Sequence, residues 1–245
     1  MLYFDEYGDK KNPTILLLHG AAALDTFYNQ YGLSQSYHLV VPHLSGAGKA
    51  AAEEYEPEKL RESLTELIEH IGKDKIGVIG HSLGAQLAIM LLCSQPEKFS
   101  FAVLLSAWVN PDAGSIKSYC KFSGAAAGLL HAGALVRLQG RYWHFSKERA
   151  AYMAEYSKRI TPQVYSSFFL NTLDLDKLPE YSGVALPMLA ICGEKELTDM
   201  KRSLEKLKKN PHCKTMILKK AGHDFPMRRA DKLNIILESF IKENC

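Results

Sequence analysis

The feature that most constrains the fold is an alternation of short apolar runs with longer helical patterns in the first half of the chain. The apolar runs are typical of buried strands: Thr14–Leu18, His38–Val41, Ile76–Ile79 and Ala102–Leu105. Pro57–Ile71 has leucine and isoleucine at helical spacing after a proline suited to a first turn, and Leu83–Leu92 is typical of a buried helix. Because parallel strands covered on both sides are continuously apolar, the pattern predicts an α/β fold whose mostly parallel sheet carries helices on both faces.

This rhythm stops after the fourth apolar run. From 107 to 186 the pattern is helical and rich in alanine, glycine and aromatic residues, with no strong strand. Strand and helix patterns then return at Met188–Cys192, Thr198–Lys209, Thr215–Leu218 and Lys232–Ile241. We therefore expect a core of residues 1–106 and 187–245, interrupted by a helical cap over residues 107–186.

The sequence Gly80-His81-Ser82-Leu83-Gly84 matches the pattern G-x-S-x-G and stands between an expected strand and an expected helix. Such a tight turn exposes the serine hydroxyl at the carboxyl edge of the sheet, and the glycines let neighbouring backbone approach closely. The helix N-terminus behind the serine favours negative charge that develops on a substrate. We predict that Ser82 is a nucleophile.

A second element follows the first expected strand, where His19 and Gly20 precede three alanines. Acyl transfer through a serine needs two donors for the tetrahedral oxyanion, one just after the nucleophile and one from this upstream loop. The expected donors are the backbone N–H groups of Leu83 and Ala21. His19 is expected to brace the loop rather than to exchange protons.

The third element, Ala221-Gly222-His223-Asp224, follows the last expected strand. A histidine in a loop opened by glycine, at the carboxyl end of a strand, can reach across the sheet edge to the serine. The chain has nine histidines, so residue type alone singles out none of them. Position and chain order favour His223 as the general base.

Taken together, these elements resemble the α/β-hydrolase superfamily over nearly the whole chain. The resemblance rests on a strand that leads to His19-Gly20, the Ser82 turn, a helical cap, the segment 193–196 and Gly222-His223. Residues 42–49, Pro-His-Leu-Ser-Gly-Ala-Gly-Lys, are similar to a family loop that reads P-D-L-x-G-x-G-x-S. His43 replaces the acid of that loop, and Ala47 stands where a histidine is often found. The departure leaves the expected fold unchanged and removes the contacts that those side chains would make.

The resemblance also implies an acid that orients the histidine. The family usually places an aspartate three residues after the glycine that ends the preceding strand; here that glycine is Gly193 and the matching residue is Glu196. A glutamate can hold the tautomer and stabilise the charged imidazole where its longer side chain is accommodated. Asp199, one helical turn further, and Asp112, after the fourth strand, remain alternatives. Asp224 is expected to make a local turn or a helix cap.

Composition bears on partners and location. The 30 basic and 27 acidic residues are scattered, and the densest basic run, Lys206–Lys209, is typical of a solvated face, so no nucleic-acid partner is expected. No apolar run approaches the roughly 18 residues that span a bilayer, and the acidic N-terminus predicts no secretory signal, so no membrane partner is expected either. Five cysteines without paired or zinc-binding spacing favour reduced thiols in the cytoplasm. Without a ligand cluster or phosphate loop, no metal or organic cofactor is expected.

The leading hypothesis is a serine esterase that cleaves a small carboxylic ester or related acyl substrate through an acyl-enzyme. A thioesterase, a C–C bond hydrolase and an acyltransferase would use the same residues. Outside enzymes, the alternative is a non-catalytic protein that binds a small ligand in the same fold. Aromatic residues of the expected cap either pack it onto the core or line an apolar pocket, and they select no natural substrate.

Overall fold

The computed structural model describes residues 2–245. Within them the sheet has seven strands in the order β1-β3-β2-β4-β5-β6-β7. Their bounds are β1 Phe4–Tyr7, β2 Thr14–Leu18, β3 His38–Pro42, β4 Ile76–His81, β5 Phe99–Leu105, β6 Met188–Gly193 and β7 Cys213–Leu218. Strands β2 to β7 are parallel to one another, and β1 runs antiparallel to β3. The prediction of a mostly parallel sheet is confirmed.

The inner strands are buried because both of their faces carry small or apolar side chains. Strands β2, β3, β4 and β6 are buried along their whole length, whereas β7, at the sheet edge, exposes Met216 and Ile217. Strand β1 at the other edge was not predicted. Its sequence, Phe-Asp-Glu-Tyr, places two acids side by side and lacks the alternation that would indicate a half-buried strand.

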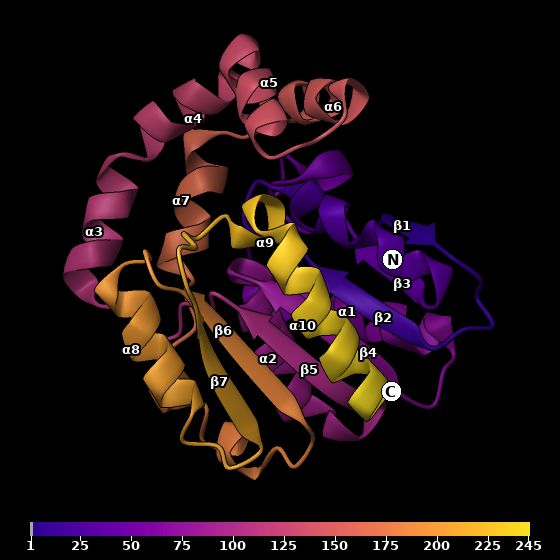
Figure 1. Cartoon of the computed structure of the whole chain (residues 1–245). Coiled ribbons are helices and arrows are strands. Elements are labelled where there is room, and N and C mark those ends of the chain that lie inside the picture. The colour runs from indigo at the N-terminus through magenta and orange to yellow at the C-terminus, as the bar shows by residue number, and fades with distance from the viewer. Residues whose placement is uncertain (1) are drawn as a thin grey trace.

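Five helices surround the sheet. Their bounds are α1 Pro57–Ile71, α2 Leu83–Ser94, α8 Thr198–Leu207, α9 Phe225–Arg228 and α10 Ala230–Asn244. Helices α2 and α10 lie on opposite faces of the sheet (Figure 1), and α1 packs against α2. Because α2 is covered by the sheet on one side and by α1 on the other, it is buried from Leu83 to Leu92, as its apolar sequence predicts. Helix α8 ends at Leu207, two residues before the expected end.

A second group of helices lies beyond the carboxyl ends of β4, β5 and β6 (Figure 1). Their bounds are α3 Ala113–Lys121, α4 Ser123–His131, α5 Gly133–Tyr142, α6 Lys147–Ser157 and α7 Pro162–Leu170. After α7 the chain returns to β6 through two short 3-10 segments. The Asn210 side chain, from the loop between α8 and β7, donates hydrogen bonds to the carbonyls of Tyr181 and Val184 in this returning segment. No helix in the described part of the chain is both long and apolar enough to cross a membrane.

Candidate active site

Ser82 occupies a strained turn between β4 and α2. Its φ of 54° and ψ of −114° lie in a region that non-glycine residues rarely adopt, and its N–H donates to the Leu105 carbonyl at 2.8 Å. The flanking glycines are required by close packing. A Cβ on Gly84 would overlap the Leu18 carbonyl oxygen, and one on Gly80 would overlap the Gly84 carbonyl oxygen. The turn therefore holds the serine at the edge of the sheet in one conformation.

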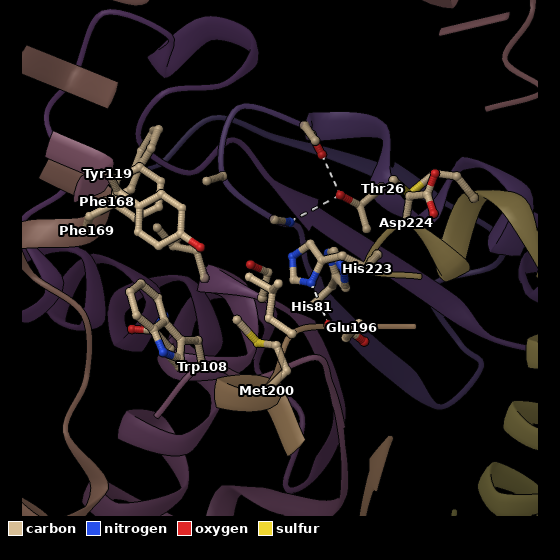
Figure 2. Close-up of a pocket in the computed structure, with 18 of the residues that line it drawn as sticks. Thr26, His81, Trp108, Tyr119, Phe168, Phe169, Glu196, Met200, His223 and Asp224 are labelled. Carbon is tan, nitrogen blue, oxygen red and sulfur yellow. Dashed lines mark hydrogen bonds and ion pairs between the residues drawn. The ribbon is translucent and has the colours of Figure 1, made fainter. Parts of the chain in front are cut away.

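Ser82 opens onto a cavity of about 610 Å³ between the sheet edge and the helices α3 to α7. His223, Glu196, Leu83 and Ala21 line the same cavity. Most of the remaining wall is aromatic or aliphatic: Trp108, Tyr119, Tyr142, Trp143, Tyr165, Phe168, Phe169, Leu197, Met200 and Met227. Figure 2 shows Trp108, Tyr119 and Phe169 on the side of the cavity away from His223. The site is thus a mostly apolar pocket that also contains Ser82, His223 and Glu196.

His223 is held by Glu196. The two residues lie in the loops that follow β7 and β6, and His223 Nδ1 is 2.8 Å from Glu196 Oε2. The other oxygen, Oε1, accepts bonds from the Gly193 N–H at 2.6 Å and the Ser106 hydroxyl at 2.7 Å. Because Glu196 is acceptor-only when ionised, these bonds place a proton on Nδ1 and leave Nε2 free.

Burial alone would raise the pKa of Glu196, whose side chain is 1% exposed. That effect is outweighed by the hydrogen bond and charge of His223, the Gly193 N–H and the Ser106 hydroxyl, so the net pKa is lowered. The carboxylate is therefore ionised at neutral pH. The longer side chain of glutamate is accommodated because it turns back to the backbone three residues earlier.

The other three carboxylates have different partners. Asp112 caps α3 by accepting bonds from the N–H groups of Gly114 and Ser115. Asp199 bonds the Ser115 hydroxyl at 3.3 Å and lies 3.5 Å from Arg202. Asp224 stands at the start of α9, but its side chain does not form the expected local cap; it accepts a bond from the Trp143 indole, 81 residues away in the chain. Of the four, Glu196 is the one bonded to His223.

His81, the second residue of the serine motif, connects the turn between β4 and α2 to the loop after β7 by a hydrogen bond. Its Nε2–H donates to the His223 carbonyl at 2.9 Å, and the two rings are 4.9 Å apart. Full burial, reinforced by the nearby His223, lowers the pKa of His81 to about 3, so the ring is neutral. The role of His81 was not predictable, because nothing in the local sequence indicates which carbonyl it reaches.

The loop after β2 brings Gly20 and Ala21 beside the serine. A Cβ on Gly20 would lie 3.6 Å from the Ser82 Cβ. The Gly20 N–H donates to the Thr26 hydroxyl, which donates in turn to the Ala23 carbonyl at 2.7 Å. Within the described residues the Ala21 N–H has no acceptor. Leu83 begins α2, so its N–H has no acceptor within the helix.

His19 braces this loop, as expected. Its Nε2 accepts a bond from the Leu44 N–H at 3.0 Å, so Nδ1 carries the proton and donates to the Gly20 carbonyl at 2.8 Å. Burial lowers the pKa of His19 to about 4, against the opposing effect of the Gly20 bond. In the loop of residues 42–49, which differs from the family pattern, His43 Nδ1 accepts a bond from the Lys49 N–H and so closes the turn.

Helix α6 also holds this loop. The Tyr156 hydroxyl, from α6, accepts a bond from the Leu24 N–H at 3.2 Å and donates to the Ala22 carbonyl at 3.3 Å. Ala22 has a φ of 57°, a left-handed conformation that costs energy for a residue with a Cβ. Sequence reasoning missed Tyr156, because its partners lie more than a hundred residues away.

Two further residues at the site were also missed. Ser106 directly follows β5 and bonds Glu196. Its position at the carboxyl end of a strand could have indicated that it lies at the site. Gln86 follows Ser82 by one helical turn and lines the same cavity, which helical spacing could have indicated. Across the described chain, no group of three or more His, Cys, Asp or Glu side chains is arranged to hold a metal ion.

Comparison with known proteins finds a family model, described as alpha/beta hydrolase fold, that matches residues 13–230. Over 254 aligned positions the chain is 23% identical to "Putative carbamate hydrolase RutD" of Stutzerimonas stutzeri strain A1501, covering 95% of this chain and 93% of that protein. A shorter match, 33% identical over 94 residues, pairs 36% of this chain with the magnesium-chelatase 30 kDa subunit of Rhodobacter capsulatus. It covers 33% of that subunit's length.

Solved structures with a similar fold come from several enzymes. A carboxylesterase structure from Nitrososphaera gargenis has a TM-score of 0.77 at 17% identity, covering 98% of this chain and 93% of that one. A bromoperoxidase from Bacillus anthracis has a TM-score of 0.77 at 16% identity, covering 98% and 95%. A meta-cleavage product hydrolase from Pseudomonas fluorescens IP01 has a TM-score of 0.72 at 17% identity, covering 98% and 93%. At these identities the likeness is one of fold.

Proposed function

This chain belongs to the α/β-hydrolase fold family, and on that premise we propose that it is a serine hydrolase that cleaves a small carboxylic ester or related acyl substrate. Ser82 is the nucleophile, His223 the general base and Glu196 the acid that orients His223. The observation that carries the proposal is the Glu196–His223 bond at the mouth of an apolar cavity that Ser82 also lines. A buried carboxylate, a histidine with a free Nε2 and a serine on a strained turn are the parts that acyl transfer requires.

The reaction proceeds in two halves. His223 Nε2 takes the proton from the Ser82 hydroxyl as its oxygen attacks the carbonyl carbon, and His223 then gives that proton to the departing alcohol. Water, deprotonated by His223, attacks the acyl-enzyme and releases the acid. Among the described residues the Ser82 hydroxyl has no hydrogen-bond partner. A hydrogen bond between a catalytic serine and its base often forms at full strength only when a substrate is bound.

The N–H groups of Ala21 and Leu83 receive the negative charge that develops on the carbonyl oxygen. Both are backbone donors beside Ser82, so they are in place before the charge appears. One such donor typically lowers the barrier by about 3–4 kcal/mol. In this proposal residues 107–186 act as a cap that shapes the acyl pocket. The five free cysteines are consistent with an enzyme of the cytoplasm.

The decisive experiment is hydrolysis of p-nitrophenyl esters from acetate to decanoate by the wild type and by Ser82→Ala. We expect turnover that falls by at least about 10³-fold in the variant, with an acyl-length optimum set by the cavity. Ser94→Ala, at the opposite end of α2, is the matched control and should keep wild-type rates. An aryl carbamate belongs in the series because a full-length relative is named as a carbamate hydrolase.

A reactive-serine probe separates an enzyme from a binding protein. A fluorophosphonate should label wild-type Ser82 and leave Ser82→Ala unlabelled. Equal rates in wild type and Ser82→Ala on every ester would refute the serine mechanism. Labelling of Ser82 without turnover of any acyl substrate would instead favour a ligand-binding role.

A further inference from the structure

Gln86 is a buried amide that faces the cavity without a role in the proposed catalysis. It lies on α2 four residues after Ser82, is 3% exposed and lines the cavity. Its Oε1 accepts a hydrogen bond from the Leu173 N–H at 2.7 Å. The side chain therefore joins the nucleophile helix to the segment that follows α7.

That bond fixes which way the amide points. A backbone N–H can only donate, so the atom facing Leu173 is the oxygen, and the NH₂ group is turned away from Leu173. Within the described residues this NH₂ group has no acceptor. The nitrogen is not fully enclosed by protein atoms, so it is accessible from the cavity that Gln86 lines. Two oriented donors are thus available to a molecule in the cavity.

The surroundings indicate what kind of molecule it is. Gln86 lies about 6 Å along α2 from Ser82, a distance that the acyl part of a substrate can span. Leu173 comes three residues after α7, the helix that carries Phe168 and Phe169 of the aromatic wall. Tyr119 stacks on Phe169 at 4.7 Å, on the side of the cavity away from His223 (Figure 2). The donor therefore lies in a pocket whose wall is mostly aromatic or aliphatic.

We propose that Gln86 determines specificity by donating to a neutral carbonyl oxygen in the acyl part of the substrate, a few bonds beyond the scissile carbonyl. The substrate class is then an oxo-, ester- or amide-substituted acyl compound rather than a plain alkyl ester. This inference rests on the proposed function. A carboxylate in the same place would lose its hydration without a nearby cation, since Lys195, beside Glu196, is the one lysine among the described lining residues.

The test compares substrates of nearly equal shape. p-Nitrophenyl 4-oxopentanoate is set against p-nitrophenyl pentanoate, and 5-oxohexanoate against hexanoate, with kcat and KM measured separately. We expect the wild type to prefer the better-placed oxo ester by about tenfold in kcat/KM, as one hydrogen bond to a buried donor allows. The monoester of glutarate supplies a carboxylate at a similar position. A preference for glutarate over both oxo esters would overturn the neutral acceptor.

Two variants isolate the donor. Gln86→Glu keeps an oxygen for the Leu173 N–H and replaces the NH₂ group, whereas Gln86→Leu removes both polar atoms. Both should bring the oxo-to-alkyl ratio in kcat/KM to one or below. A wild-type ratio of one for both pairs, or an unchanged preference in both variants, would overturn the assignment.

Binding separates this inference from the proposed function. Calorimetric titration of Ser82→Ala with the same esters measures recognition where the nucleophile is absent. Tighter binding of an oxo ester there, together with no turnover by the wild type, would refute serine hydrolysis and leave the Gln86 assignment standing. Equal binding and equal wild-type turnover within each pair would refute the Gln86 assignment while hydrolysis stands.

Discussion

Replacing Glu196 by glutamine tests the site most directly, because the change alters hydrogen-bonding chemistry and hardly alters shape. In the wild type, Oε2 holds His223 Nδ1 at 2.8 Å, and Oε1 accepts the Gly193 N–H and the Ser106 hydroxyl. Glutamine offers one acceptor and one donor group in place of two acceptors. It can therefore satisfy one side of this arrangement and not both.

The structure indicates which side the glutamine satisfies. If its NH₂ group faced the Gly193 N–H, two donors would oppose each other in a buried site, at a cost of about 1–3 kcal/mol. The oxygen therefore faces Gly193 and the NH₂ group faces His223 Nδ1. The imidazole must then carry its proton on Nε2, which cannot accept the proton of Ser82.

The expected loss follows from that tautomer. The equivalent amide substitution in a Ser-His-Asp triad lowers kcat by about 10⁴-fold, and the geometry here predicts a fall of about 10³ to 10⁴, or roughly 4–5.5 kcal/mol in the barrier. KM should change little, because Glu196 is buried behind His223. The assay is steady-state hydrolysis of a p-nitrophenyl ester at neutral pH, with thermal unfolding to verify the fold.

The controls are Asp199→Asn and Asp112→Asn, which carry the same change at the two alternative acids. Both should keep kcat within about twofold, since one acid contacts Ser115 and Arg202 and the other caps α3. A folded Glu196→Gln enzyme that retains more than a tenth of wild-type kcat would refute the assignment. A severe loss in Asp199→Asn would transfer the role to that residue.

Three further predictions concern the supports of the site. Tyr156→Phe removes both hydroxyl bonds to the loop that holds Ala21, the proposed oxyanion donor, so kcat should fall about tenfold with KM nearly unchanged, as measured by the same assay. Gly84→Ala should destabilise by more than about 3 kcal/mol in denaturant unfolding because a Cβ meets fixed backbone, whereas Gly124→Ala, where a Cβ meets open space, should not. Asp25 is 1% exposed, and burial raises its pKa to about 6 despite Arg149 at 3.3 Å. The pKa of Asp25 in the folded state exceeds its ordinary value of 3.8, so between pH 4 and 6 the native state binds more protons than the unfolded state. As pH rises through this window, the stability of the wild type relative to Asp25→Asn should fall by about 3 kcal/mol, and a flat difference would contradict the shift.

The core was predictable because its signals are local. Each inner strand is buried on both faces, so its sequence is apolar from end to end and its place in the sheet follows from the alternation with helices. Strand β1 pairs along one edge only, and its register opposite residues 39–42 depends on tertiary contact rather than on pattern. The turn at Ser82 was predictable because its pattern is local, a serine between two glycines at the junction of a strand and a helix, although Gly84 packs against Leu18 of another strand.

The carboxylate bonded to His223 was predictable in position and not in geometry. Spacing from Gly193 indicated Glu196, but Asp199 and Asp112 also follow strands that end at this edge. The distinction depends on how the side chain turns back to the Gly193 N–H and on Ser106, which belongs to another strand. Those contacts are set by the packing of β5 beside β6, which no local pattern contains.

Two of the contacts that the sequence did not indicate join the sheet-forming part of the chain to residues 107–186. Tyr156 reaches the loop beside Ala21 from α6, and Leu173 orients Gln86 from the segment after α7. Under the proposed function, a displacement of these helices would disturb both the loop beside Ala21 and the Gln86 amide. The two effects are separable, because the first acts on kcat for every ester and the second on the ratio between esters. Substitutions beneath α6 should therefore change rate without changing preference, and substitutions near Leu173 should do the reverse.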